Sequence, residues 1–506
     1  MSTATNAAKP AGGFLARDFT ASIVVFLVAM PLCMGIAIAS GVPPEKGLIT
    51  GIIGGIVVGA LAGSPLQVSG PAAGLAVIVF ELIRDQGLSA LGPILILAGA
   101  IQVAAGIFRL GGWFRAISPA VVHGMLAGIG VLIVVGQFHV LFDAKPLSSG
   151  LDNLTAMPGR LLGLDPANVT ATELALALAV LTIGIMIAWD KFRPASLKLV
   201  PSALLGVVAA TLVAYFAGLD VTRVNVPESI ASAVALPDAS IFAKWLDPSI
   251  LLSALAIAFI ASAETLLSAA AVDKMHDGVR TDYNKELRAQ GVGNLLCGAA
   301  GALPMTGVIV RSSANVQAGA VTRLSAMLHG VWILGFVALL PWLLREIPMA
   351  TLGAVLVVTG WKLVNLSHVR ELFQHHGVLP AVIWAATLIV VVAEDLLTGV
   401  LVGIGLSLIE VIPHFRRLKL GVEQDEGDHG VAIRLSGAAT FVQLPKLSDV
   451  LDRAPAGKPV VLDGTQLATV DHTCAELMRD WLARRRSSDN QVTVLGGSGP
   501  LARLAA

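Results

Sequence analysis

The chain has 506 residues, of which 55% are hydrophobic and only 13% are charged, and its 34 basic residues balance its 34 acidic residues. Soluble domains carry about 25% charged residues because their surface meets water, so this composition excludes a soluble enzyme and a disordered scaffold. A formal net charge of +0 gives no bulk attraction to nucleic acid, and we expect no nucleic-acid partner. The composition predicts a protein whose surface largely meets the lipid bilayer.

Fourteen hydrophobic runs follow one another along the chain, and most have the ~17–25 residues that a helix needs to cross a bilayer. We therefore predict a mostly α-helical membrane domain over residues 18–420, preceded by a short cytoplasmic segment, 1–17. The predicted spans are 18–40, 47–63, 72–84, 90–108, 118–142, 172–189, 198–217, 248–271, 288–303, 312–321, 324–344, 348–364, 378–393 and 395–414.

The third and tenth spans, 72–84 and 312–321, are too short to cross a hydrocarbon core of ~30 Å at ~1.5 Å per residue. They stand third in each half of a seven-plus-seven arrangement, which predicts two inverted repeats. Each follows a stretch with proline and glycine, 66–71 and 304–311. Paired interrupted segments at matching positions are typical of a transporter's binding site. Because non-helical backbone within a membrane must lie against protein or water, we predict that both breaks line a cavity. A re-entrant loop near one surface is the alternative.

Lysine and arginine are distributed unevenly between the two sets of loops. If the N-terminus is cytoplasmic, that side holds most of them, from Lys9 to Lys419, and the outer side holds few, among them Arg84 and Lys145. Cytoplasmic loops carry this excess in membrane proteins. We therefore expect both termini in the cytoplasm and a multi-pass protein of the inner (plasma) membrane.

Glu264 lies inside the apolar eighth span, where a carboxylate costs several kcal/mol unless it faces a cavity, a cation or a proton. Ser268 follows one helical turn later on the same face. These side chains, with backbone carbonyls of Met305 and Thr306, could form an oxygen site for Na⁺. Glu264 alone could instead bind and release H⁺. A structural hydrogen bond to a neighbouring helix is the third interpretation. Beyond Na⁺ or H⁺ as coupling ion, we expect no cofactor and no other metal.

Arg311 stands at the start of the tenth span. A helix N-terminus carries about half a positive charge and unpaired N–H groups, and the third span offers a second such end. Two ends that face each other would hold an anion, and Arg311 would add a full charge. Alternatively, Arg311 pairs with Glu264 or lies at the cytoplasmic surface. The candidate anion-binding residues are Gly70, Pro71, Ala72, Ala73, Thr306, Gly307, Arg311 and Ser312.

After Lys419 the composition becomes that of a soluble α/β domain, which we expect over 421–506. Residues 421–429 are charged and polar and predict a linker or surface turn. Strands are predicted at 431–435, 460–463 and 492–495, and helices at 444–453 and 471–486. No nucleophile–base arrangement stands out in this domain, so an enzyme is the least favoured class.

Several motifs together resemble the SulP anion permease family, which includes sulfate permeases, bicarbonate and dicarboxylate carriers and the prestin group. The first helix and loop match at 30–37 and 41–48, the third-helix signature at 67–71 and the tenth-helix signature at 311–325. The tail resembles a STAS domain at 461–463 and 470–473. Because it covers nearly the whole chain in this order, the resemblance is specific.

The resemblance implies a homodimer in which a core domain (helices 1–4 and 8–11) moves against a gate domain (5–7 and 12–14) like an elevator. It implies an anion site between the third and tenth helix starts, and in sodium-coupled members the position of Glu264 belongs to the Na⁺ site, with a hydroxyl at Ser268. Leu32 stands where sulfate carriers have glutamine, which favours bicarbonate or carboxylate. Glu264 replaces the aspartate of sodium-coupled carriers, which favours H⁺.

The sequence thus predicts a secondary active transporter of a small anion, with bicarbonate first and sulfate next, coupled to H⁺ or Na⁺. A dicarboxylate or nucleobase permease, a passive anion channel and a membrane-tethered signalling protein remain as rival interpretations. The STAS-like domain could bind a cytoplasmic protein partner.

Overall fold

The computed structural model of the chain describes residues 12–114, 118–147, 149–164, 170–197, 199–227, 230–234, 245, 247–276, 278–364, 378–411, 420–427, 430–440, 443–455, 459–487 and 492–495. The chain divides into two compact units. The first comprises Met1–Gly111, Leu126–Val364 and Val391–Leu397, and the second comprises Gly112–Met125, Asn365–Val390 and Thr398–Ala506. Most of the N-terminal segment 1–17 and residues 496–506 of the predicted tail domain lie outside the described residues.

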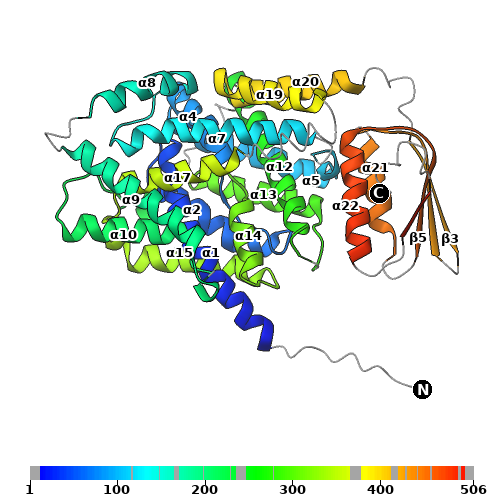
Figure 1. The fold of residues 1–506 in the computed structure, drawn as a ribbon, viewed down its shortest axis with the longest axis horizontal. Helices are drawn as coiled ribbons and strands as arrows, with labels where there is room; N and C mark the ends of the chain where they lie inside the picture. The colour runs from blue at the N-terminus through cyan, green and yellow to red at the C-terminus, as the bar shows by residue number, and fades with distance from the viewer. Residues whose placement is uncertain are drawn as a thin grey trace. The chain divides into compact units, whose positions relative to one another are not determined.

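Each of the fourteen predicted spans overlaps a helix in the described part of the chain (Figure 1). These helices are α1 (Gly12–Ala39), α2 (Pro44–Ile53), α4 (Ala73–Gln86), α5 (Leu91–Ile107), α7 (Pro119–Leu141), α9 (Ala171–Phe192), α10 (Ser202–Phe216), α12 (Pro248–Asp273), α13 (Tyr283–Ala299), α14 (Ile309–Gln317), α15 (Leu324–Leu339), α17 (Met349–Leu363), α19 (Val378–Ala393) and α20 (Leu396–Val411). A π-helical turn, η1 (Gly54–Val58), joins α2 to α3 (Gly59–Leu61). The remaining short elements are α6 (Gly111–Phe114), α8 (Gly150–Leu162), α16 (Pro341–Leu344), η2 (Leu88–Ala90), η3 (Ala195–Leu197) and η4 (Ile230–Ala233).

The lengths and hydropathy of the helices agree with a membrane protein. Within the described residues, six helices are long and apolar enough to cross a bilayer, and five shorter apolar helices accompany them. The fold is therefore mostly helical and membrane-embedded. That all fourteen segments cross the bilayer as two inverted repeats remains a prediction.

Two local differences from the sequence prediction have capping interactions as their cause. The sequence predicts the ninth span at 288–303 after a charged loop, but α13 begins at Tyr283 because the Asp282 side chain accepts hydrogen bonds from the backbone N–H groups of the first turn. Helix α8 is absent from the predicted spans. Ser149 caps this helix by accepting a hydrogen bond from the N–H of Asp152. Its amphipathic pattern has too few apolar residues to look like a span.

A row of glycines brings α5 and α13 into close contact. Gly92, Gly99 and Gly106 recur every seven residues on α5, and Gly291 and Gly298 do so on α13. A Cβ added to Gly99 would lie 2.6 Å from the carbonyl oxygen of Gly291, and one added to Gly291 would lie 2.7 Å from that of Gly99. Small residues allow such backbone approach between membrane helices. This packing positions α13, which carries polar side chains to the site described below.

The tail forms a four-stranded sheet in the order β3-β4-β5-β6. Its strands are β3 (Leu420–Gly427), β4 (Gly430–Ala439), β5 (Val460–Val470) and β6 (Val492–Leu495), and its helices are α21 (Leu444–Arg453) and α22 (His472–Ser487). β3 and β4 are antiparallel, whereas β4–β5 and β5–β6 are parallel. Both helices lie on one side of the sheet (Figure 1), as crossover connections between parallel strands require.

The linker predicted at 421–429 is wrong for residues 421–427. They form β3, which pairs with β4 from Leu420↔Gly437 to Gly427↔Gly430. Polar residues can form an edge strand when a neighbouring strand supplies the hydrogen bonds, and charge at an edge discourages pairing with another chain. Tertiary pairing therefore overrides the local composition here.

Candidate functional site

Two three-residue strands pair within the first unit, at the two breaks that precede the short predicted spans. We call this strand pair the strand crossing. β1 (Ser69–Pro71) pairs antiparallel with β2 (Met305–Gly307), with Gly70 opposite Thr306. All six residues are buried. The pairing satisfies backbone groups that a break would otherwise leave without partners inside a membrane. It also brings together two segments that lie more than 200 residues apart in the sequence.

Each strand leads directly into a helix. Ala72 precedes α4 and Val308 precedes α14, and neither residue caps its helix through a side chain. The first N–H groups of an α-helix have no intrahelical partner, and together with the helix dipole they favour a negatively charged ligand. Because β1 and β2 are paired, the two helix starts lie on either side of one strand crossing. Residues 70–73 and 306–312 thus lie at these two helix starts, and their role in binding an anion remains a prediction.

Arg311, in the first turn of α14, is fully buried at 0% exposure. Its Nη2 donates a long hydrogen bond of 3.4 Å to the carbonyl oxygen of Pro71, and the Cys33 side chain is a further close partner of the guanidinium. Nε and Nη1 make no hydrogen bond of regular geometry within the described residues. A Cβ added to Gly70 would lie 2.0 Å from Nη1, so the guanidinium lies directly against β1. A buried cation without a counter-ion is unfavourable. The guanidinium can therefore accommodate an anion beside the two helix starts.

Two of the interpretations considered for Arg311 are wrong. Its complete burial excludes a position at the cytoplasmic surface. Among the described side chains, no ion pair joins it to Glu264. The two charged side chains therefore form no direct ion pair with each other.

Glu264 lies in the middle of α12 and is 9% exposed. Its carboxylate has Thr306 of β2 as a hydrogen-bond partner. Its Oε2 atom is buried without a partner in the described part of the chain. A Cβ added to Gly74 would lie 1.9 Å from Oε1, so the carboxylate packs against the first turn of α4. The purely structural interpretation of Glu264 does not account for the unpartnered oxygen, which can accept a proton or a cation.

The remaining predicted residues lie around this crossing. Ser268 is buried one turn after Glu264 on α12. The carbonyl oxygen of Met305 accepts a hydrogen bond of 3.2 Å from Asn294 Nδ2 and keeps a second lone pair. Ser312 Oγ accepts a hydrogen bond of 2.9 Å from the N–H of Val68 and donates one of 2.7 Å to the carbonyl of Val308. Ser312 therefore positions the two breaks relative to each other, and its hydroxyl is already engaged.

Polar side chains from neighbouring helices hold the strand pair in place, and none of them is among the residues predicted from the sequence. Asn294 of α13 accepts a hydrogen bond from the N–H of Met305, at 2.8 Å, in addition to the bond that it donates. Thr265 Oγ1 accepts from the N–H of Gly307 at 3.1 Å, and its carbonyl accepts from Gln67 Nε2 at 2.9 Å. Gln290 donates to Ser69 Oγ at 2.6 Å. The sequence offered one signal for these residues, because Gln290 and Asn294 are amide side chains within an otherwise apolar predicted span.

Substitution of two glycines should distinguish the role of Arg311 from that of Glu264. In Gly70→Ala the new methyl group displaces the Arg311 guanidinium, and in Gly74→Ala it displaces the Glu264 carboxylate. We expect Gly70→Ala to raise the KM for the anion by about tenfold, since a charged hydrogen bond contributes about 1.5–3 kcal/mol. Gly74→Ala should instead reduce the dependence of uptake on a cation gradient. The measurement is initial-rate uptake into proteoliposomes.

Gly335→Ala on α15 is the matched control, because nothing lies within 4 Å of its added Cβ. It should leave both quantities unchanged. Equal effects of Gly70→Ala and Gly74→Ala on the anion KM would contradict separate anion and cation sites.

Comparison with solved structures identifies the fold. The transmembrane domain of a cyanobacterial bicarbonate transporter, BicA, superposes with a TM-score of 0.67 at 23% identity, covering 77% of this chain and 98% of that one. The structure of SLC26A9 superposes with a TM-score of 0.68 at 14% identity, covering 98% of this chain and 87% of the other. The chain thus shares the fold of these two structures.

Sequence comparisons define the family. The pattern of the Sulfate permease family matches residues 15–387. YvdB of Bacillus subtilis (strain 168), which its name assigns provisionally to sulfate transport, is 32% identical over 78% of this chain and 73% of its own. The bicarbonate transporter BicA of Synechocystis is 26% identical over 83% of this chain and 74% of its own. The chain belongs to the sulfate permease (SulP) family of anion transporters.

Proposed function

We propose that this protein is a secondary active transporter that moves a small anion, with bicarbonate first and sulfate next, together with H⁺ or Na⁺. The observation that carries the proposal is the β1–β2 crossing, which places two uncapped helix starts beside buried Arg311 and the carboxylate of Glu264. One crossing thus combines features for an anion with a carboxylate for a cation. A passive channel would have no need for a carboxylate that binds a cation.

The proposed mechanism is mutual neutralisation of charge. The anion accepts hydrogen bonds from N–H groups at the starts of α4 and α14 and from Arg311, and it offsets their positive charge. The cation, H⁺ or Na⁺, offsets Glu264, and in the Na⁺ case Ser268 and the carbonyl groups of Met305 and Thr306 complete the oxygen site. With both ligands bound the site is nearly neutral, so its movement through the bilayer avoids the cost of a buried net charge.

The proposed movement is that of an elevator. α1–α5 and α12–α15 would form the moving core, and α7–α10 with α17–α20 would form the gate. We further propose fourteen membrane crossings in two inverted repeats, both termini in the cytoplasm, an inner-membrane location and a homodimer. The α/β tail would be a STAS-like regulatory or dimerising domain that is able to bind a cytoplasmic protein partner.

One feature of the site supports bicarbonate over sulfate. Leu32 and the residues at the start of α4, Ala72 and Ala73, offer no side-chain hydrogen-bond donor, so backbone N–H groups and Arg311 must bind the anion. A smaller singly charged anion requires fewer donors than sulfate. The relatives do not decide between the two anions, since YvdB is named for sulfate and BicA for bicarbonate.

Uptake of labelled bicarbonate, sulfate and fumarate into proteoliposomes, each with an imposed Na⁺ or pH gradient, tests the proposal. We expect bicarbonate to accumulate against its gradient, driven by one of the two cations. Accumulation of fumarate alone would support a dicarboxylate carrier, and uptake that only equilibrates would support a passive channel.

The same uptake assay also tests a nucleobase permease and a signalling protein. A nucleobase permease carries a nearly neutral ligand and has no use for the buried charge of Arg311, so competition by uracil would be required to support it. If the tail were the active part of a signalling protein, deletion of the residues after 429 would abolish function. Full uptake by that truncated protein would argue against the signalling interpretation.

A further inference from the structure

Gln102 lies inside the apolar helix α5 and is 1% exposed, yet both ends of its amide are hydrogen-bonded. Its Oε1 accepts a hydrogen bond of 2.7 Å from Asn294 Nδ2 on α13, and its Nε2 donates one of 3.2 Å to Ser262 Oγ on α12. Within the described residues, none of these three side chains has a buried polar atom without a partner. Because fully satisfied buried networks are rigid, Gln102 links α12 firmly to α13.

The close contact between α5 and α13 allows the two amides to meet. Gly99 and Gly291 stand three residues before Gln102 and Asn294, on the same helix faces. A Cβ added to Gly99 would lie only 2.6 Å from the carbonyl oxygen of Gly291. The backbones therefore approach closely enough for the short side chain of Asn294 to bond to the neighbouring helix.

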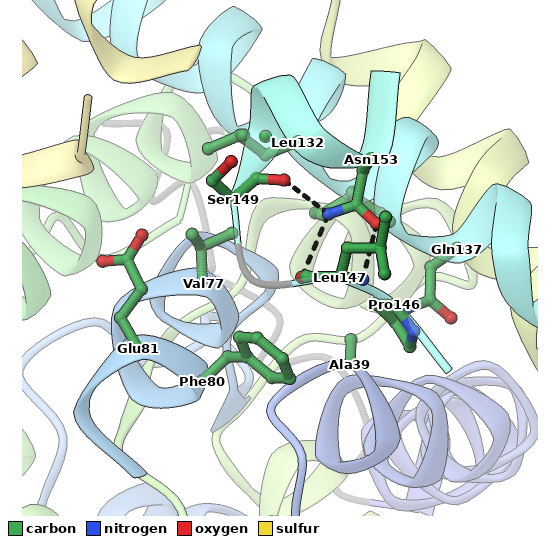
Figure 2. A pocket seen from close by; sticks show the side chains of 13 residues that line it. Ala39, Val77, Phe80, Glu81, Leu132, Gln137, Pro146, Leu147, Ser149 and Asn153 are labelled. Atoms are coloured by element: carbon green, nitrogen blue, oxygen red, sulfur yellow. Dashed lines mark hydrogen bonds between the residues drawn. The ribbon is translucent and has the colours of Figure 1, made fainter. Parts of the chain in front are cut away.

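Asn294 holds β2 through two bonds to one residue. Its Oδ1 accepts from the N–H of Met305 at 2.8 Å, and its Nδ2 donates to the carbonyl of Met305 at 3.2 Å. The same pattern recurs beside a small pocket, where the amide of Asn153 bonds to the N–H and the carbonyl of Leu147 (Figure 2). There the third bond goes to the local backbone, whereas that of Asn294 goes to Gln102. Gln102 thus orients the amide that holds β2.

Helix α12 holds the other end of β2, which closes a ring of hydrogen bonds. Thr265 Oγ1 accepts from the N–H of Gly307 at 3.1 Å. The ring runs from Ser262 through α5, α13 and β2 back to Thr265, and these two residues flank Glu264 on α12. Thr306, between the two fixed ends of β2, is the hydrogen-bond partner of the Glu264 carboxylate. The ring therefore frames the contact between Thr306 and Glu264.

We propose that Gln102 is a positioning residue for the coupling cation, because it closes the ring that fixes β2 relative to Glu264. This inference rests on the proposed function and concerns Na⁺. A metal cation requires several oxygens at fixed distances, whereas H⁺ requires only the carboxylate. The carbonyl groups of Met305 and Thr306 belong to the strand that the ring holds. Gln102 acts through this strand and does not itself contact the ion.

Gln86 provides a matched control for Gln102. It is the last residue of α4, and its Nε2 donates a hydrogen bond of 3.3 Å to Ser253 Oγ on α12. This is the same kind of glutamine–serine link to α12, but Ser253 stands eleven residues before Glu264, which is ~16 Å along the helix at ~1.5 Å per residue. Loss of this link should therefore leave the cation site unchanged.

Hydrogen–deuterium exchange of the full-length protein in detergent tests the ring. In Gln102→Met the flexible side chain keeps a similar length but loses both hydrogen bonds. We expect the backbone of residues 303–307 to exchange about three- to tenfold faster than in the parent, which corresponds to the loss of one supporting hydrogen bond. Gln86→Met should leave exchange in this segment unchanged. Parental exchange in Gln102→Met would show that the ring does not fix β2 and would overturn the proposal.

Na⁺ binding to the same proteins tests the role in the cation site. The Kd follows from the thermal unfolding midpoint as choline chloride is replaced by NaCl. Gln102→Met should raise this Kd by about three- to tenfold, and Gln86→Met by less than about twofold. Ser262→Ala opens the ring at α12 with a smaller change and should act like Gln102→Met, so it replaces that variant if folding fails. An unchanged Kd in both ring variants, or a parent that binds no Na⁺, would contradict the positioning role.

Uptake into proteoliposomes separates this inference from the transport function. In Gln102→Met the half-saturating Na⁺ concentration should rise by the same factor, while the anion KM at saturating Na⁺ stays within about twofold. Equal weakening of both would indicate general loosening and would refute the specific role, as would coupling to H⁺ alone. If the parent accumulates no anion although Gln102→Met weakens Na⁺ binding, the proposed transport function is wrong and the positioning role stands.

Discussion

Arg311→Gln should raise the KM for the transported anion by about 30- to 100-fold, which corresponds to the 2–3 kcal/mol that a buried charged hydrogen bond contributes. The guanidinium is fully buried, and its Nε and Nη1 atoms make no hydrogen bond of regular geometry among the described residues, so their contribution is available to a ligand. Initial rates of labelled bicarbonate and sulfate uptake at saturating cation provide the measurement. Because the change removes an unpaired buried charge, the fold should be retained.

Arg323→Gln is the matched control for this prediction. Arg323 precedes α15 and donates a hydrogen bond from Nη1 to the carbonyl of Ala60, outside the strand crossing. Its loss should leave the anion KM within about twofold, because this half-buried charge lies outside the anion site. An Arg311→Gln protein with the parental KM would mean that the helix starts bind the anion without this residue.

Glu264→Gln should abolish the coupling of uptake to a cation gradient. Glutamine keeps the shape and can still bond to Thr306, but it neither binds a proton nor attracts Na⁺ near neutral pH. Gradient-driven accumulation should therefore fall to the level without a gradient, while the melting temperature stays close to that of the parent. Uptake with imposed Na⁺ or pH gradients and thermal unfolding in detergent are the two measurements. Uptake that keeps its response to the gradient would refute the coupling role.

Glu286 provides a contrasting control, because it is even more deeply buried but structurally engaged. Its Oε2 accepts hydrogen bonds from the N–H groups of Gly63 and Ser64 at 2.8 and 2.9 Å, and its Oε1 accepts one from Gln290. In Glu286→Gln the amide group places a donor against these donors, so the melting temperature should fall. Burial of a carboxylate alone does not therefore predict coupling. The unpartnered oxygen of Glu264 makes the difference.

The two variants act on different ligands, which makes the proposed mechanism testable as a whole. Mutual neutralisation requires that Arg311→Gln weakens binding of the anion and that Glu264→Gln weakens binding of the cation. It also requires that each ligand improves binding of the other, since each removes net charge from the same site. Anion affinity that is independent of the cation concentration would separate the two sites energetically.

Single residues that interrupt a strong pattern could be recognised in the sequence. Glu264 interrupts an apolar helix, Arg311 opens a short helix, and each short helix follows a break. In the tail, alternating and amphipathic patterns predict β6 and α21 with the bounds that the structure has. These features are local, since they depend on side-chain chemistry and on spacing within one segment.

The sequence alone determined that this is a helical membrane protein with two interrupted segments, a buried acid and a basic helix start, because hydropathy, length and charge are properties of short stretches of chain. Only the tertiary structure decided which of these features meet. The pairing of β1 with β2, the contact of Arg311 with Gly70, the support from Asn294 and Thr265 and the link through Gln102 all join residues far apart in the chain. Such contacts depend on how helices pack against one another, which no local pattern contains.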